Sequence, residues 1–412
     1  MCGITGFIDF DFQQDKDVLW NMVNTLHHRG PNDKGAELFE NKFARIGLAQ
    51  SRLSIIDLSS GGHQPMTYEE ISIVFNGEIY NYKEIRKDLI ELGHHFNTSS
   101  DTEVILQAYS EWGIECVNKF IGMFAIVLYD RDKDKCYLIR DRAGVKPLFY
   151  FWKNDTLIFG SELKAFYECD QFEKKINPSS VLSYFNHGYV PAPSCIFENS
   201  YKVNAGAWIE FNLIEKCFKE HVYWDIIDFY TKPKLDINFE DAKNQMHELL
   251  KSSFNYRMVA DVPIGVFLSG GYDSSIVTAI LQNQRKESLN TFTIGFEEGN
   301  NEAPYAKEIA KFLGTNHTEY FCTVREAQEI IPDLPYFYDE PFGDSSAIPT
   351  TLVSKIAKEK VTVALSADGG DEIFCGYDVY PFLQNKNDII NKLPAYLKVT
   401  VKYLLKVLVK GG

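Results

Sequence analysis

Met1-Cys2-Gly3-Ile4-Thr5-Gly6-Phe7-Ile8 is the stretch of this 412-residue chain that decides the fold of its first half. Removal of the initiator methionine would leave Cys2 as the N-terminal residue. Such a cysteine combines a nucleophile with its own base, because its α-amino group can take up the thiol proton. The small and apolar residues after it predict a strand that begins at the nucleophile. A buried cysteine that merely stands second is the alternative, and the later motifs decide between the two.

Composition restricts the class of protein. The chain is 45% hydrophobic and 24% charged, with a formal net charge of −15. These values are typical of a globular protein whose main partner is neither nucleic acid nor an anionic membrane. Eight scattered cysteines without a CxxC pair fit a reducing compartment. No signal-peptide pattern is present, and lysines interrupt the apolar stretch 393–409. We therefore expect a cytoplasmic protein with no membrane partner.

Three polar features stand out in the first half. Arg52 interrupts the apolar and hydroxyl-rich run 48–57, which predicts a strand, and a buried arginine needs a carboxylate from a ligand or from a structural aspartate. Asn76-Gly77 is typical of a hairpin turn, yet a side-chain amide beside an unhindered N–H can also form an oxyanion hole. Asp101 starts a predicted helix, where capping is the simplest role.

The order of the predicted elements indicates two domains. Many strands with few helices in residues 1–210 predict a layered α+β sandwich. The adjacent His27 and His28 invite a metal site, but no third ligand stands at a useful spacing, so packing in a loop is favoured. The mixed stretch 211–238 is the expected linker. Residues 239–412 then form the second domain.

A glycine-rich motif opens the second domain. The run 264–268 predicts a buried strand, 269–275 a loop, and the residues after it a helix. This arrangement binds phosphate through backbone N–H groups and the helix dipole. Asp273 would repel a bare phosphate, so its natural role is to hold Mg²⁺ on it.

Further strands alternate with helices in this domain. The predicted strands 289–296 and 361–365 indicate an α/β doubly wound parallel sheet, with its site at the carboxyl ends of the strands. The second of these strands leads into another acidic, glycine-rich loop, 366–372. Asp371 in that loop is a second candidate Mg²⁺ ligand.

Taken in order, these motifs resemble the glutamine-hydrolysing asparagine synthetase family. The motifs of the first half are Cys2-Gly3-Ile4, His28-Arg29-Gly30-Pro31, Ser51-Arg52-Leu53-Ser54-Ile55, Asn76-Gly77-Glu78-Ile79-Tyr80-Asn81, Ser100-Asp101-Thr102-Glu103 and Arg140-Asp141-Arg142. Those of the second half are the loop 269–275, the loop 366–372 and Glu340-Pro341-Phe342-Gly343-Asp344-Ser345-Ser346. The resemblance implies a class II glutamine amidotransferase domain with an N-terminal-nucleophile (αββα) fold, followed by an ATP pyrophosphatase domain.

The resemblance also implies roles for single residues. Cys2 would attack the glutamine side-chain amide, with Asn76 and Gly77 as the oxyanion hole. The implied glutamine-binding residues are Arg52 for the α-carboxylate, Glu78 and Asp101 for the α-ammonium group, and Leu53, Ser54, Ile55, Ile56, Asn76 and Gly77. Those implied for ATP and pyrophosphate are Leu268, Ser269, Gly270, Gly271, Asp273, Ser274, Ser275, Ile294, Ser366 and Ala367, with Asp273 and Asp371 as Mg²⁺ ligands.

The implied activity is glutamine-dependent asparagine synthesis, in which ATP activates aspartate and AMP and pyrophosphate are released. Two alternatives stay open from the sequence: an amidotransferase acting on another carboxylate, such as a surface-polysaccharide sugar acid, and a glutaminase-only or inactive fragment. The implied substrates are glutamine, aspartate and ATP with Mg²⁺, and a homodimer is compatible with them. Family members continue into a helical region with a lysine in a Lys-Val-Asp type sequence. Because no such motif follows Tyr380, we expect a member that is truncated at its C-terminus.

Overall fold

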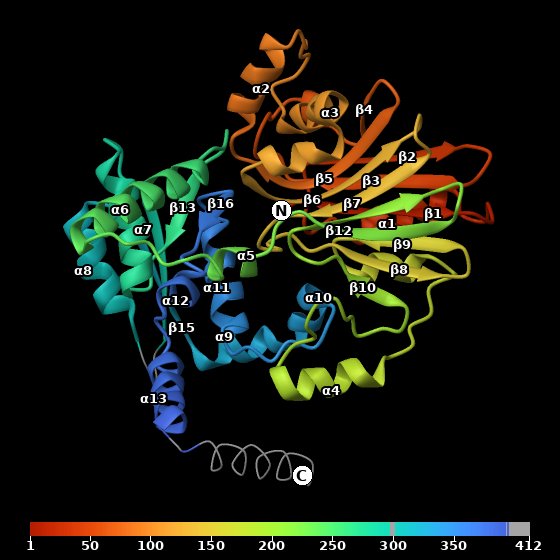
Figure 1. Cartoon of the computed structure of the whole chain (residues 1–412). Coiled ribbons are helices and arrows are strands. Elements are labelled where there is room, and N and C mark those ends of the chain that lie inside the picture. Colours follow the sequence, from red (N-terminus) through yellow and green to blue (C-terminus); the bar gives the residue numbers. More distant parts are fainter. Residues whose placement is uncertain (297–300, 393, 395–412) are drawn as a thin grey trace. The chain divides into compact units, whose positions relative to one another are not determined.

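The computed structural model describes residues 1–296, 301–392 and 394 (Figure 1). The described residues divide into two compact units. The first lies within Met1–Gly265, Ile294–Asn301 and Glu319–Ala364, and the second within Val266–Thr293, Glu302–Thr318 and Leu365–Gly412. The apolar stretch 393–409 named above lies outside the described residues, apart from residue 394. In the part of the chain that is described, no helix combines the length and apolar character that crossing a bilayer requires.

Two six-stranded antiparallel sheets make up most of the first unit. The first sheet has the order β10-β8-β9-β1-β3-β2, formed by β1 (Gly3–Asp9), β2 (Asp33–Glu40), β3 (Arg45–Arg52), β8 (Phe149–Lys153), β9 (Thr156–Gly160) and β10 (Ser200–Lys202). The second has the order β12-β11-β7-β6-β5-β4, formed by β4 (Met66–Tyr68), β5 (Ile71–Ile79), β6 (Gly122–Asp130), β7 (Lys135–Arg140), β11 (Ala207–Asn212) and β12 (Cys217–Val222).

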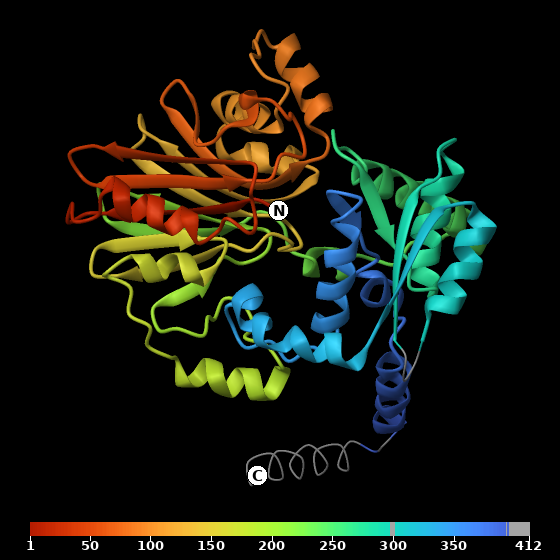
Figure 2. The ribbon, with the colours of Figure 1, turned by 180° about the vertical axis from the view of Figure 1, so that it is seen from behind.

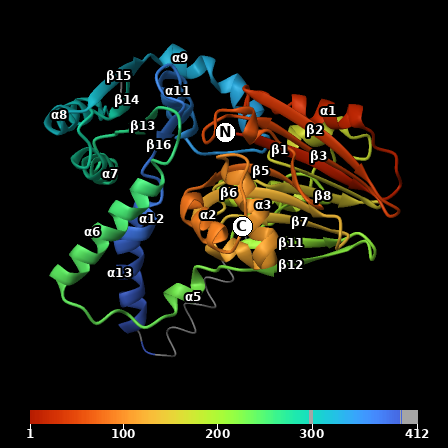
Figure 3. The same cartoon turned by 90° about the horizontal axis from the view of Figure 1, so that it is seen from above.

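Three apolar cores separate four layers. Helix α1 (Lys16–Asn24) covers the outer face of the first sheet, which Figure 2 shows from behind. Helices α2 (Tyr82–Glu91) and α3 (Asp101–Trp112) cover the outer face of the second sheet, and the layers can be followed in Figure 3. Successive residues of β6 alternate between the core beneath these helices and the core between the sheets. This confirms the predicted αββα sandwich.

The third sheet has the order β15-β14-β13-β16 and is parallel. Its strands are β13 (Ile264–Phe267), β14 (Asn290–Phe296), β15 (Asn316–Cys322) and β16 (Val363–Leu365). From β13 the chain adds β14 and then β15 on one side of the sheet, and it later adds β16 on the other side of β13. The strand order therefore reverses beside β13. This confirms the predicted doubly wound sheet, in which ligands bind at the reversal.

The remaining helices are short or connect these layers. They are α4 (Pro178–His187), α5 (Ile227–Tyr230), α6 (Phe239–Tyr256), α7 (Tyr272–Asn283), α8 (Ala303–Leu313), α9 (Val324–Glu329), α10 (Leu334–Tyr338), α11 (Ala347–Ala357), α12 (Gly370–Phe374) and α13 (Val379–Lys392), with 3₁₀ turns at Ser60–Gly62, Gly113–Lys119, Leu163–Glu168 and Ile331–Asp333. Helix α4 and strand β15 were not predicted, because neither has a continuous apolar face: α4 buries only Ser180 and β15 only Cys322.

Three local expectations were wrong. Strand β3 ends at Arg52 instead of continuing to residue 57, because its partner β2 begins at Asp33, which pairs with Arg52. Asn76-Gly77 forms no hairpin turn but lies inside β5, paired along its length with β6. The expected linker contains β12, which extends the second sheet beyond residue 210 to Val222. Most of β12 is exposed, so its sequence lacks the apolar alternation of a strand.

Candidate active site

Cys2 immediately precedes β1, and its thiol lies against the loop that follows β3. The Leu53 N–H donates to Cys2 Sγ at 3.3 Å. The Arg29 Nε–H donates to the Cys2 carbonyl oxygen at 2.9 Å, so the backbone of Cys2 is held as well. In the chain with Met1 in place, the terminal amino group belongs to Met1, and Lys146 Nζ lies 3.0 Å from Met1 Sδ. Loss of Met1 moves the terminal amino group onto Cys2.

Burial controls the protonation of this end of the chain. It raises the pKa of the Cys2 thiol, an effect that the Leu53 N–H only partly opposes. It lowers the pKa of the Met1 amino group to about 5, so this amino group is neutral at pH 7. The thiol is therefore protonated at rest and needs a base, which a neutral terminal amine can provide.

Cys2 opens into a pocket that the three-dimensional fold assembles from five separate stretches of the first unit. We call it the Cys2 pocket, and it is lined by Cys2, Gln50, Arg52, Leu53, Ile55, Ile56, Gly62, Gln64, Phe75, Gly77, Glu78, Ser100, Asp101 and Thr102. Of the residues predicted for glutamine, the lining includes all but Ser54 and Asn76. The fold thus brings together residues up to 100 positions apart, as the motifs predicted.

Two buried carboxyl groups in the pocket, Glu78 and Asp101, have pKa values above the ordinary range. Burial raises the pKa of Glu78 well above its ordinary range, and the nearby Asp101 raises it further. Burial also raises the pKa of Asp101 to about 7, although its Oδ2 accepts the Ile79 N–H at 3.0 Å. The buried Lys146, whose pKa burial lowers to about 8, opposes the shift of Glu78 only in part. A ligand that brings a positive charge would favour ionisation of both acids.

Arg52 holds its loop through carbonyl oxygens. Its guanidinium donates to the carbonyls of Ser59 at 3.0 Å, of Ile56 at 3.3 Å, and of Asp57. A Cβ on Gly62 would come within 1.8 Å of Arg52 Nη2, so only glycine fits against this side chain. Among the described residues Arg52 forms no ion pair with a carboxylate, although its charge acts to lower the pKa of Glu78 and Asp101. Of the two roles left open, a carboxylate ligand is the one that this environment favours.

Asp101 does not have the capping role that is simplest for its position. The N-cap of α3 is Ser100, whose Oγ accepts the Thr102 N–H at 3.1 Å. This leaves the Asp101 carboxylate free to bond the end of β5 and to line the Cys2 pocket. The capping interpretation was therefore wrong by one residue.

The expected oxyanion residues lie on β5. Asn76 Nδ2 donates to Ser161 Oγ at 3.4 Å, and Ser161 Oγ also accepts the Ile4 N–H at 3.1 Å, which ties Asn76 to the strand that begins after Cys2. Asn76 Oδ1 is buried and has no partner among the described residues. A Cβ on Gly77 would lie 2.1 Å from the Met123 carbonyl oxygen, so β5 and β6 require glycine there.

Sequence reasoning missed several residues of this site. Gln64 accepts the Phe75 N–H at 2.7 Å and donates to Thr102 Oγ1 at 2.9 Å, and so joins β5 to α3. Gln50 donates to the Phe75 carbonyl at 2.6 Å. Lys146 lies near Cys2 only in the folded chain, so no sequence pattern could have identified it as a residue of this site.

The pH dependence of stability tests the burial of Asp101. The pKa of Asp101 is higher in the folded than in the unfolded chain. The contribution of Asp101 to the free energy of unfolding is therefore complete below the ordinary pKa range of an aspartate, and it is lost as pH rises through about 7. Asp101→Asn, which stays neutral, should therefore raise the melting temperature of the ligand-free protein, and by more at pH 8 than at pH 5. The gain at pH 8 should be several degrees, at roughly 2–4 °C per kcal/mol for a protein of this size.

Asp57→Asn is the matched control. Burial tends to raise the pKa of Asp57, but hydrogen bonds from Ser59 and Ser99 overcome this and lower it. Its stabilising contribution is thus present above the ordinary aspartate range and lost as pH falls, so Asp57→Asn should lower the melting temperature at pH 8. Equal gains for Asp101→Asn at pH 5 and pH 8 would contradict the assigned pKa shift.

The second unit carries the other predicted site, at the carboxyl end of β13. Ser274 Oγ accepts the Ser269 N–H at 3.2 Å, and Ser275 Oγ donates to the Gly271 carbonyl at 2.6 Å, so the loop is held by its own hydroxyls. Gly270 has φ +90°, in the region that favours glycine. Gly271 makes no side-chain cap to α7, which leaves the first N–H groups of this 12-residue helix for an anion.

The two acidic loops meet in this unit. A Cβ on Gly370 would lie 2.3 Å from Asp273 Oδ2, so the loop that carries Asp371 packs directly on Asp273. Carboxylate oxygens beside a phosphate cradle fit Mg²⁺. Leu268, Ser366 and Ala367 of the predicted ATP set also belong to this unit, whereas Ile294 lies on β14 within the first unit.

Comparison with known proteins agrees with this geometry. Residues 1–224 match the family model of a glutamine amidotransferase domain, and residues 245–411 match that of asparagine synthase. The chain is 39% identical over 421 residues to a putative asparagine synthetase [glutamine-hydrolyzing] 2 of Methanocaldococcus jannaschii, covering 97% of this chain and 80% of that protein. It is 35% identical over 394 residues to asparagine synthetase [glutamine-hydrolyzing] 1 of Bacillus subtilis, covering 92% of this chain and 59% of that protein.

A third relative, asparagine synthetase [glutamine-hydrolyzing] 3 of Bacillus subtilis, is 31% identical over 405 residues, with 92% of this chain and 63% of that protein covered. The chain thus spans about three fifths of the two Bacillus proteins and four fifths of the archaeal one. The chain belongs to the glutamine-hydrolysing asparagine synthetase family of enzymes, with a glutamine amidotransferase domain followed by an asparagine synthase domain.

Proposed function

We propose that this chain transfers the amide nitrogen of glutamine to aspartate and so makes asparagine at the expense of ATP. The observation that carries the proposal is the charge pattern of the Cys2 pocket, which is lined both by Arg52 and by the buried acids Glu78 and Asp101. Its small-molecule partners are glutamine, aspartate and ATP. A homodimer and a cytoplasmic location stay predictions.

The pocket suits a zwitterionic amino acid. The guanidinium of Arg52 can pair with the α-carboxylate of glutamine through two parallel hydrogen bonds. The α-ammonium group of the same ligand would lie by Glu78 and Asp101, and its charge would lower the pKa of both acids and ionise them. The ligand therefore supplies a second cation beside the two acids, in addition to Arg52, and this selects for an amino acid over a simple amide.

The first reaction is hydrolysis of the side-chain amide. Cys2 Sγ attacks the amide carbon while the terminal amino group takes the thiol proton, which it then gives to the departing ammonia. Asn76 Nδ2 and the Gly77 N–H would stabilise the negative charge on the amide oxygen. Water then attacks the thioester, which releases glutamate and returns the thiol. The raised pKa of the Cys2 thiol means that this base is required at neutral pH.

The second reaction joins the ammonia to aspartate. The Gly270 N–H and the N–H groups at the start of α7 would bind the ATP phosphates, and Asp273 and Asp371 would hold Mg²⁺. Bound Mg²⁺ would neutralise charge on the phosphates. The β-carboxylate of aspartate attacks the α-phosphorus and pyrophosphate leaves, after which ammonia attacks the acyl carbon and AMP leaves.

A product balance tests the proposal. With glutamine, aspartate and Mg-ATP, the chain should form glutamate, asparagine and pyrophosphate in equal amounts. With ammonium in place of glutamine, asparagine and pyrophosphate should form without glutamate. Release of glutamate without any pyrophosphate would instead identify a glutaminase, and aspartate-independent pyrophosphate release would identify another acceptor.

A further inference from the structure

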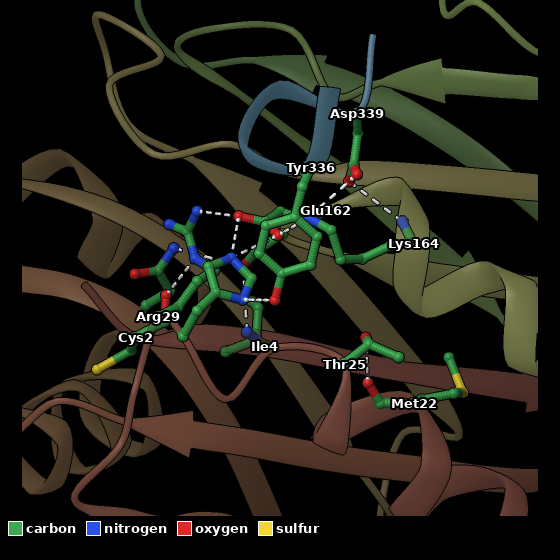
Figure 4. Close-up of polar contacts among 12 residues, drawn as sticks. Cys2, Ile4, Met22, Thr25, Arg29, Glu162, Lys164, Tyr336 and Asp339 are labelled. Atoms are coloured by element: carbon green, nitrogen blue, oxygen red, sulfur yellow. Dashed lines mark hydrogen bonds and ion pairs between the residues drawn. The ribbon is translucent and has the colours of Figure 1, made fainter. Parts of the chain in front are cut away.

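A chain of polar contacts between largely buried side chains leads away from Cys2 (Figure 4). Arg29 holds the Cys2 carbonyl oxygen at 2.9 Å through Nε, and its Nη1 donates to Glu162 Oε1 at 2.7 Å. Glu162 in turn pairs with Lys164, whose Nζ lies 3.0 Å from Asp339 Oδ1. These contacts, which we call the Glu162 relay, connect the nucleophile to a residue more than 330 positions away in the sequence.

A second branch reaches the same segment. His28 Nε2 lies 3.0 Å from Glu162 Oε2, and the other ring nitrogen of His28, Nδ1, shares a hydrogen bond of 3.1 Å with the Tyr336 hydroxyl. Lys164 Nζ also lies 4.9 Å from the centre of the Tyr336 ring. The stretch from Tyr336 to Asp339 is thus held at both ends by groups that contact Glu162.

Glu162 is the centre of the relay. Burial tends to raise its pKa, but the hydrogen bond from His28 and the charges of Arg29 and Lys164 outweigh burial and lower the pKa to about 2. The carboxylate is therefore charged at any pH at which the enzyme works, with cations on several sides. Loss of a partner leaves a buried charge uncompensated, so the remaining side chains must move to restore the balance.

The far end of the relay is unusual in its own backbone. Asp339 has φ +58°, a left-handed conformation that is uncommon for a residue other than glycine. Its side chain is 5% exposed, and burial raises its pKa. Lys164 holds the Asp339 carboxylate through both its ammonium group and its backbone, since the Lys164 N–H donates to Asp339 Oδ2 at 3.1 Å. The position of Asp339 thus depends on Lys164.

The two ends of the relay come from different domains of the family. Cys2, Arg29 and Glu162 fall in the residues matched by the glutamine amidotransferase model, whereas Tyr336 and Asp339 fall in those matched by the asparagine synthase model. All five nevertheless belong to the same compact unit. The contacts therefore provide a physical route from the acceptor domain to the nucleophile.

We propose that Glu162 and Lys164 are positioning residues that make the alignment of Cys2 depend on the seating of the segment from Tyr336 to Asp339. This inference rests on the proposed function and adds a means by which the acceptor domain sets the rate of glutamine hydrolysis. The Nη2 of Arg29 supports it, because this buried atom has no hydrogen-bond partner among the described residues. Arg29 is thus held in place by Glu162 and Cys2, and a shift of Glu162 passes directly to the Cys2 carbonyl.

Asp339→Asn is the sharpest test, because Asp339 touches neither Cys2 nor its pocket. Without the negative charge of Asp339, Lys164 should pair more strongly with Glu162. Glu162 should then shift toward Lys164 and away from Arg29. We expect kcat for glutamate release to fall about 10-fold, since a misplaced reacting group can cost up to about 100-fold. The KM for glutamine should stay within about 2-fold, because the Cys2 pocket is untouched. Alkylation of Cys2 by iodoacetamide, followed by mass spectrometry of the N-terminal peptide, should slow in parallel.

Lys202→Met is the matched control. Lys202 Nζ forms an ion pair with Glu340 Oε2 at 2.6 Å. Glu340 follows Asp339 in the sequence, but no hydrogen bond or ion pair joins this pair to Glu162 among the described residues. If the relay is specific, this variant should keep kcat and Cys2 alkylation within about 2-fold of the parent. An equal loss in both variants would overturn the proposal and show that general packing of the segment is what matters.

Two further variants keep the proposal testable if Asp339→Asn does not fold. Tyr336→Phe removes only the hydroxyl that holds His28 and should lower kcat about 3-fold, a smaller loss because the lysine branch stays. Lys164→Met combined with Asp339→Asn should be no worse than the more damaging single change, since both act through Glu162. Additive losses, or unchanged kcat and alkylation in Asp339→Asn, would overturn the proposal. An inactive parent chain would instead reject the proposed function, and the alkylation rates would still test the relay.

Discussion

Cys2→Ala should lower glutamate release by about 10⁴-fold or more, because Cys2 is the only thiol among the residues that line the Cys2 pocket. Asparagine formation from free ammonium should continue at the parent rate, since that reaction does not use the thiol. The measurement is glutamate release from glutamine beside ammonium-dependent pyrophosphate release, on the same preparation. The ratio of the two rates removes any effect of partial unfolding.

Cys217→Ala provides the control for this change. Cys217 is a free, exposed cysteine on β12, away from the pocket lining, so its loss should leave both rates unchanged. Residual glutamate release in Cys2→Ala within 100-fold of the parent would contradict the assignment of Cys2 as nucleophile. Retention of Met1 should likewise suppress glutamate release, because the terminal amino group would then belong to the wrong residue.

Asp273→Asn should have the opposite selectivity. Loss of the carboxylate removes a ligand for Mg²⁺ and disturbs the contact with the loop at Gly370, so aspartate-dependent pyrophosphate release should fall by about 100-fold or more. Glutamate release at Cys2 should change little, because the two reactions use different side chains. A pyrophosphate assay with ammonium as nitrogen source, repeated over a range of Mg²⁺ concentrations, measures this.

Glu372→Gln is the neighbouring control. Glu372 stands beside Asp371 in α12, but its carboxylate accepts a hydrogen bond from the Tyr377 hydroxyl at 2.8 Å and is exposed. Pyrophosphate release should therefore stay close to that of the parent. Partial recovery of Asp273→Asn at high Mg²⁺ would support a role in metal binding, whereas full activity at all concentrations would remove Asp273 from the site.

Much of the fold and site could be predicted because the signals are local. An apolar run of strand length, a glycine-rich loop before a helix, and a cysteine at position 2 are all properties of neighbouring residues. The same holds for the motifs around Arg52, Asn76 and Asp101, whose order along the chain identified the family. The predicted sandwich and doubly wound sheet followed from this pattern, and the structure confirms both.

The errors fall where a local pattern competes with tertiary pairing. Asn76-Gly77 has the sequence of a turn, yet β6 pairs with β5 along its whole length and keeps the pair extended. The exposed strand β12 joins the second sheet through β11, although its own residues have no buried face. Propensity is a weak influence compared with a complete ladder of hydrogen bonds, so the sheet decides these segments.

The sequence by itself determined which candidate groups this protein has and in what order: the predicted nucleophile, the predicted oxyanion amide, and the glycine-rich loop with its acids. Only the tertiary structure decided which of these groups are buried and what they face. It turned the Asp101 carboxylate into the Cys2 pocket, left Arg52 surrounded by neutral carbonyls, and placed Glu162 between Arg29 and Lys164. The physical reason is that the charge state of a group depends on burial and on neighbours distant in the chain, and these exist only once the layers have packed.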